Sequence, residues 1–208
     1  MNLLQHCLLK LGEESGEIAT ALLAKENLIV GVSALSNTQE INLEVNDLEA
    51  VIRKLNCEFA FEYCIQESNE HKLGACEYAN KDMAFWVMFT VNSCLALSKI
   101  SSKCIQFGLK EKHPDLNKDN HQRLCLAIHD VFFGIKRLNE FGLGYEVDEL
   151  YISNKLIKIN HYLQYSISLN CVNDFPEPKK INLDEYSPVS SKIRFTTQEV
   201  EWPKPRNK

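Results

Sequence analysis

The decamer DLEAVIRKLN at residues 47–56 recurs further along the chain as DVFFGIKRLN at residues 130–139. Both decamers begin with aspartate, end with Leu-Asn, and carry isoleucine followed by two basic residues at the same places. Lys72-Leu recurs as Lys155-Leu, again 83 positions later, just as position 130 follows position 47. Two matched stretches at one fixed offset indicate an internal duplication.

The residues around the first decamer have the apolar periodicity of amphipathic helices. Residues 1–25 contain no proline, and a second helix is expected from Asn37, which forms a capping-box pattern with Glu40. The apolar stripes are Leu4, Leu8, Leu11, Ile18 and Leu22 on the first helix and Ile41, Val45, Leu48, Ile52 and Leu55 on the second. A less regular third helix is expected at residues 60–80. The sequence therefore predicts an all-α fold.

The duplication divides the chain into three parts. We expect a first helical unit at residues 1–82, a second at residues 83–172, and an extended tail at residues 173–208, which holds five of the six prolines. Each unit of three or four helices would bury its apolar face poorly alone and well against the other. The prediction is a helical bundle built as an internal pseudo-dimer.

The composition limits the classes of partner. A chain of 208 residues with 45% hydrophobic residues can bury a core, and its net charge of −5 disfavours binding to a nucleic-acid polymer. The eight cysteines form no CxxC pair and no secretory signal is recognisable, which favours reduced thiols in the cytoplasm. The apolar stretch from Met83 to Ser98 is shorter than the ~20 residues that span a bilayer. We therefore expect a buried helix there and no membrane segment.

Two carboxylate motifs interrupt the apolar stripes of the first unit. Glu13, Glu14 and Glu17 form Glu-Glu-x-x-Glu on the first helix, and Glu44 and Asp47 form Glu-x-x-Asp on the second. Spacings of three and four residues bring side chains to one helical face. Glu14 and Glu44 each lie three residues after one stripe position and four before another, so they point towards the core.

Acids gathered between packed helices repel one another and lose hydration, so they must bind protons or a cation. Oxygen ligands without His or Cys favour Mg²⁺, or Mn²⁺, over zinc, and Mg²⁺ commonly completes its shell with substrate phosphates. A solvated helix face is the common alternative for a glutamate cluster. Two motifs on sequential helices, both within the core stripe, favour the metal site.

The two motifs, separated by the 26 residues 18–43, resemble the signature of the MazG and dimeric dUTPase superfamily. The stretches LKLGEESGEIATALLAK (9–25), NLEVNDLEAVIRKLN (42–56), SKCIQFGL (102–109) and NKLIKINHYLQYS (154–166) look like phage and bacterial MazG-like proteins. The resemblance covers about residues 1–172. It implies an all-α nucleoside triphosphate pyrophosphatase, which releases the monophosphate and pyrophosphate.

By this resemblance Glu14, Glu17, Glu44 and Asp47 are expected to bind the metal, with Glu13 a further ligand or the residue that orients the attacking water. Such families are usually dimeric, so this chain is expected to be a monomer with an internal pseudo-dimer or a homodimer. A phage-encoded protein of this kind would act in the host cytoplasm. The nucleotide stays open among dUTP, dCTP, dGTP, damaged nucleotides and alarmones. The alternative is a protein of the same fold that sequesters a nucleotide or signal, or binds a protein partner, without turnover.

The second unit lacks the acids of the first. Depending on the register, the Glu-Glu-x-x-Glu positions become Asn92, Ser93 and Ala96, or Ala96, Leu97 and Ile100. Glu44 is replaced by Ala127, and only Asp130 keeps its carboxylate. We therefore expect no metal site of this kind in the second unit.

A helical face of the second unit offers cations instead. Lys155, Lys158 and Tyr162 share one face, whereas the first unit has Lys72 but Ala75 at the place of the second lysine. We hypothesise that these residues bind the phosphates and the nucleotide opposite the metal. The alternative is that the lysines extend along the surface into solvent.

Two weaker patterns remain. His121, Cys125 and His129 have a spacing that suits zinc on a helix, but no fourth ligand is evident. Five aromatic residues either stack on a base or belong to the core, and the core is the usual place for them. These residues are Phe85, Trp86, Phe89, Phe132 and Phe133.

Overall fold

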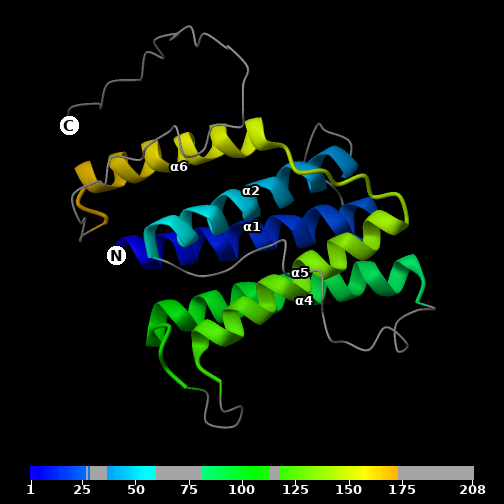
Figure 1. Ribbon diagram of the computed structural model, residues 1–208, viewed down its shortest axis with the longest axis horizontal. Coiled ribbons are helices and arrows are strands. Elements are labelled where there is room, and N and C mark those ends of the chain that lie inside the picture. The colour runs from blue at the N-terminus through cyan, green and yellow to red at the C-terminus, as the bar shows by residue number, and fades with distance from the viewer. Residues whose placement is uncertain (27, 29–36, 60–80, 113–117, 173–208) are drawn as a thin grey trace, which may run out of the picture. The chain divides into compact units, whose positions relative to one another are not determined.

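The computed structural model describes residues 1–26, 28, 37–59, 81–112 and 118–172, which form five α-helices (Figure 1). Of these residues 82% are helical and none is in a strand, which confirms the predicted all-α fold. The third helix expected at residues 60–80, the tail at residues 173–208 and Lys72 lie outside the described residues.

The first two helices bury the predicted stripes. Helix α1 spans Leu3–Lys25 and helix α2 spans Asn37–Phe59, and the two run antiparallel (Figure 1). Four stripe residues of α1 and all five of α2 have no exposed surface, and only Leu4 remains partly exposed. The fully buried residues are Leu8, Leu11, Ile18, Leu22, Ile41, Val45, Leu48, Ile52 and Leu55. The helical periodicity thus identified this part of the core.

Three more helices follow: α4 (Met83–Phe107), α5 (Asn120–Glu140) and α6 (Glu149–Ser168). Each begins after an aspartate whose side chain accepts a hydrogen bond from a backbone N–H in the first turn. Such caps satisfy amide groups that have no partner within the helix. The capping residues are Asp82, Asp119 and Asp148.

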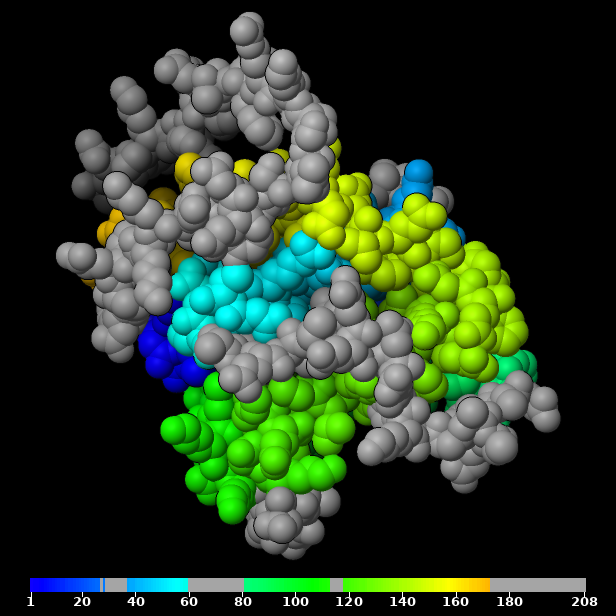
Figure 2. All heavy atoms as spheres, in the orientation of Figure 1, coloured from blue at the N-terminus to red at the C-terminus, as the bar shows by residue number. Residues whose placement is uncertain are grey.

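Each helix packs against one or two of the others. Helix α1 contacts both α2 and α4, α5 packs against α4, and α6 packs against α2. In the space-filling view α6 lies against α2 on one face of the bundle (Figure 2). Helix α2 begins at Asn37 and α5 at Asn120, which keeps the offset of 83 between the predicted repeats. Two helix pairs joined through α1 and α4 match the arrangement expected of an internal pseudo-dimer, which stays a prediction.

Helix α4 is the described helix that is long and apolar enough to cross a membrane. One side of it packs against α1 and α5, and Trp86 on that side is completely buried. The Trp86 ring lies 5.6 Å from that of Phe133 on α5, in a T-shaped arrangement. Phe132 is also buried, while Phe85, Phe89 and Phe133 pack against the core and stay partly exposed. The aromatic residues therefore contribute to the α4–α5 core.

Candidate metal centre

Three carboxylates from α1 and α2 converge. Oxygen atoms of Glu14, Glu17 and Glu44 all lie within 4.8 Å of one another. Glu14 is 3% exposed, Glu44 is partly buried, and Glu17 faces solvent. The helical spacing places Glu14 and Glu17 on one face of α1, and the antiparallel packing brings Glu44 opposite them. The cluster therefore extends from the protein interior to the surface.

Asp47 belongs to the same centre but faces a different partner. It is 6% exposed and accepts a hydrogen bond from the Lys155 ammonium group of α6. The same Lys155 nitrogen lies 3.4 Å from Oε1 of Glu14. Lys155, from the predicted second unit, thus contacts acids of the predicted first unit. It points inwards to carboxylates, whereas the sequence suggested a lysine that binds phosphate or extends into solvent.

Several carboxylate oxygens of the centre lack a partner. Oε2 of Glu14, Oε2 of Glu44 and Oδ1 of Asp47 are buried and accept no hydrogen bond in the described structure. A buried polar atom without a partner is costly, and for an anion the cost is larger. These atoms are all hard oxygen donors, which suit Mg²⁺ or Mn²⁺. The donor set therefore fits a divalent cation.

Burial and the negative charge gathered in the centre raise the pKa values of two of its acids. Burial raises the pKa of Glu14 to about 7, although Lys155 opposes the shift, and the nearby Asp47 and Glu17 add to it. Burial together with Glu17, Asp47 and Glu14 raises the pKa of Glu44 to about 8. The ion pairs with Asp47 and Glu14 outweigh burial and raise the pKa of Lys155. Near neutral pH the centre holds protons that a divalent cation would displace.

A hollow of about 410 Å³ opens beside the cluster. It combines acids from α1 with basic and aromatic side chains, and its volume lies within the range of about 300–1,000 Å³ that is usual for small-molecule sites. The residues that line it are His6, Lys10, Glu13, Glu14, Glu17, Lys155, Lys158, Ile159, Tyr162 and Ser166. The three residues predicted to share one helical face, Lys155, Lys158 and Tyr162, therefore line the hollow that Glu14 and Glu17 also border.

Glu13 occupies the edge of this hollow. Its carboxylate is exposed and accepts a hydrogen bond of 2.6 Å from Lys10. It is not among the three acids whose oxygens converge. The structure thus places Glu13 beside the site, where it borders the space open to a ligand.

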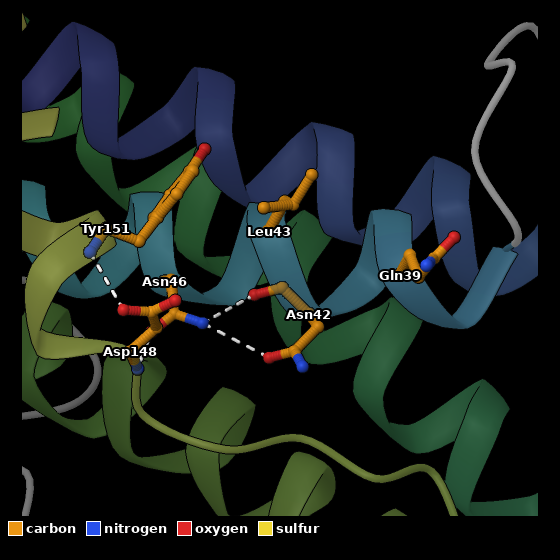
Figure 3. Close-up of a pocket in the computed structure, with 6 residues that line it drawn as sticks. All are labelled: Gln39, Asn42, Leu43, Asn46, Asp148 and Tyr151. Atoms are coloured by element: carbon orange, nitrogen blue, oxygen red, sulfur yellow. Dashed lines mark hydrogen bonds between the residues drawn. The ribbon is translucent and has the colours of Figure 1, made fainter. Parts of the chain in front are cut away.

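Asn46 was not recognised from the sequence, yet it fixes the start of α6 (Figure 3). Its amide nitrogen donates to the backbone oxygens of Asn42 and Glu146 at 2.8 and 3.1 Å. Its Oδ1 accepts a hydrogen bond of 2.9 Å from the backbone N–H of Asp148, the residue that caps α6. Asn46 itself is 2% exposed, and these partly buried bonds link α2 to the start of α6.

A second link between α2 and α6 is ionic. The guanidinium group of Arg53 donates to Glu49 on α2 and to Glu149 on α6, with its closest bond to Glu149 measuring 2.6 Å. The hydroxyl group of Tyr145 donates to the other oxygen of Glu49 at 3.1 Å. These contacts and the Asn46 link hold α6 in the position from which Lys155 reaches Asp47. Arg53 occurs in the first decamer, and its pairing with Glu49 has the i,i+4 spacing of a helix, but its partner Glu149 on α6 could not be read from the sequence.

Residues of the predicted second unit border a hollow of their own. A space of about 340 Å³ between α4 and α5 is lined by Ala96, Ile100, Ala127 and Asp130, together with Lys118, Arg123 and Leu126. At the offset of 83 the first four positions correspond to Glu13, Glu17, Glu44 and Asp47. The duplication and its register stay predictions.

The zinc pattern on α5 does not assemble a site. The Cys125 sulfur lies 3.8 Å from Nε2 of His121. Within the described parts of the chain, however, Glu14, Glu17 and Glu44 are the residues whose ligand atoms gather in a group of three or more. Burial also raises the pKa of Cys125 to about 11, which disfavours the thiolate that zinc requires.

Comparison with known proteins found no matching family model, curated protein or solved structure.

Proposed function

We propose that this chain is a magnesium-dependent nucleotide pyrophosphohydrolase, which cleaves a nucleoside triphosphate or related polyphosphate nucleotide between the α and β phosphates. The observation that carries the proposal is the convergence of Glu14, Glu17 and Glu44, with unpartnered buried oxygens, beside a hollow that lysines also line. The resemblance of the two carboxylate motifs to the MazG-like superfamily gives the reaction class.

Glu14, Glu17 and Glu44 would hold the Mg²⁺ or Mn²⁺ ion, with Asp47 behind them in contact with Lys155. When bound, the ion would supply positive charge against the polyphosphate and would polarise the attacking water. Oxygen ligation by carboxylates commonly leaves positions on Mg²⁺ for water and substrate phosphates. Solvent exposure of Glu17 leaves this side of the cluster accessible.

The chain's own groups would position the rest of the substrate. Lys158 and Lys10 border the hollow and attract phosphate oxygens, while Tyr162 offers an exposed ring on which a base can stack. Glu13, at the edge, would accept a hydrogen bond from a water molecule and orient it. Because the α6 residues come from the second unit, a monomer would contain both halves of the site.

The decisive experiment measures pyrophosphate release from a panel of nucleoside triphosphates and alarmones, with Mg²⁺, with Mn²⁺ or with a chelator. We expect release from at least one nucleotide that requires the cation and falls to background in Glu14→Gln and Glu44→Gln. Glu40→Gln is the matched control, because Glu40 lies one turn from Glu44 on α2 and outside the cluster.

A thermal-shift screen with the same nucleotides separates an enzyme from a binding protein. Stabilisation by a nucleotide without release of pyrophosphate, in the presence of either cation, would replace the proposed enzyme by a protein that sequesters that nucleotide. Release that persists in both glutamine variants would show that the cluster is not the catalytic site.

A further inference from the structure

We infer that Lys155 takes the place of a second divalent cation, so that this centre binds a single Mg²⁺ or Mn²⁺ ion on its Glu14–Glu17–Glu44 side. The inference rests on the proposed metal site and specifies how many ions that site holds. Four carboxylates on two helices would otherwise be enough to hold a pair of divalent ions about 4 Å apart.

The four acids are divided between two groups of contacts. The Lys155 ammonium group binds Asp47 and lies 3.4 Å from Oε1 of Glu14. Glu14, in turn, belongs to the cluster with Glu17 and Glu44, and its Oε2 is buried without a partner. Glu14 therefore connects an acid that already has a cation with two acids that do not.

The Lys155 ammonium group and a second divalent ion cannot both lie between Asp47 and Glu14. A protonated lysine has three donors and no acceptor, so it neutralises carboxylates but cannot bind a metal. A divalent ion between Asp47 and Glu14 would face the ammonium group at close range inside the protein, where Coulomb repulsion is weakly screened. With 16% of its side chain exposed, Lys155 has little room to move aside into solvent.

The position of Lys155 is built into the fold. Helix α6 is attached to α2 by the partly buried bonds of Asn46 to Glu146 and Asp148, and by the ion pair of Arg53 with Glu149. Lys155 lies less than two turns after Glu149 on the same helix. The second unit, which lost its own acids, thus supplies a fixed cation to the first.

The test counts Mn²⁺ ions per chain by equilibrium binding and calorimetry, with electron paramagnetic resonance to detect spin coupling between paired ions. The full-length protein is expected to bind one ion, with no coupled pair. Lys155→Met removes the cation from Asp47 and from one side of Glu14, and this variant is expected to bind two coupled ions. Lys155→Arg, which keeps the charge, and Lys158→Met, which changes a lysine at the edge of the hollow, are expected to bind one.

The outcomes separate this inference from the metal site itself. Two coupled ions in the unchanged protein, or one ion in a folded Lys155→Met variant, would overturn the inference and leave the metal site standing. If Lys155→Met does not fold, the count in the unchanged protein and in Lys155→Arg decides. Absence of Mn²⁺ binding, or binding that Glu44→Gln leaves unchanged, would overturn both the metal site and the inference.

Discussion

The ammonium nitrogen of Lys155 lies 3.4 Å from Oε1 of Glu14, although Glu14 belongs to the first helix of the chain and Lys155 to the last described one. The pair joins the two predicted repeats at the acidic centre. Because Lys155 lies on α6, the position of this helix decides whether a positive charge reaches the acids. The contacts that hold α6 in place can therefore be tested by substitution.

Asn46→Ala is expected to loosen α6. The substitution removes the acceptor for the Asp148 N–H and the donor to the Glu146 carbonyl group, and it leaves both backbone groups without their buried partner. Loss of such bonds costs about 1–3 kcal/mol. Urea unfolding should report this loss of stability. Relative to the unchanged protein, amide hydrogen exchange should become faster at the start of α6, and it should change less in α4.

Asn154→Ala is the control for this substitution, because Asn154 is an exposed asparagine within α6. It should leave the exchange of α6 unchanged. Equal exchange in the Asn46→Ala variant and the unchanged protein would show that Asn46 does not hold the helix.

The helices and the acidic cluster could be predicted because both follow from local periodicity. Apolar stripes defined the buried faces of α1 and α2, and the interruption of those stripes by Glu14 and Glu44 placed these acids at the contact between the helices. Helix α5 begins at Asn120, 83 positions after α2 begins at Asn37, in keeping with the offset between the decamers. Each of these inferences needs only the spacing of residues along one helix or between two copies of a motif.

Contacts between distant helices could not be predicted in the same way. The sequence placed Lys155 on the face of α6 that borders the site, but whether it met phosphate, solvent or carboxylates depended on how closely α6 packs against α2. Asn46 gave no signal, since a polar residue next to a stripe is equally compatible with solvent exposure. Its role depends on the backbone of Glu146 and Asp148, which comes near only in the folded chain.

Gly134→Ala is expected to destabilise the protein by about 1–3 kcal/mol, the usual cost of overpacking. Helices α4 and α5 approach so closely at this glycine that an added Cβ would lie 2.2 Å from Oγ1 of Thr90. Thr90 cannot easily give way, because it is fully buried and its hydroxyl group donates to the Trp86 carbonyl group. Chemical denaturation would measure the loss.

Gly16→Ala provides the matched comparison for Gly134. It is also a helical glycine, but an added Cβ there would meet no atom within 4 Å. The alanine should stabilise the helix by up to about 1 kcal/mol. Similar effects of the two substitutions would contradict the close packing of α4 on α5.

Thiol labelling of the native protein should distinguish buried from exposed cysteines. Burial raises the pKa of Cys7 and of Cys94 to about 12, so both lack thiolate as well as access at neutral pH. Cys57 and Cys171 are exposed. Mass spectrometry after a short exposure to a maleimide should find the label on Cys57 and Cys171 well before Cys7 and Cys94, and early labelling of Cys94 would contradict the packing of α4.

The stability of the metal-free protein is expected to fall as the pH rises. The pKa is raised from 4.5 to about 7 for Glu14 and to about 8 for Glu44. At a pH between 4.5 and the raised pKa of each acid, the folded protein therefore holds a proton that the unfolded chain has released. Stability decreases with pH wherever the folded state binds more protons. The contribution of the two acids is therefore complete below pH 4.5 and is lost as the pH passes about 7 and then about 8.

Glu44→Gln isolates this effect, because glutamine stays neutral at every pH. In a chelator, the melting temperature of the variant should exceed that of the unchanged protein at about pH 9, and the difference should shrink towards about pH 5. Glu40→Gln should show no such trend, since Glu40 lies outside the cluster. Saturating Mg²⁺ should reverse the order at high pH, because the ion stabilises only a protein that keeps its ligand. A difference between Glu44→Gln and the unchanged protein that stays constant with pH, with and without Mg²⁺, would mean that Glu44 is neither protonated in the folded state nor a ligand.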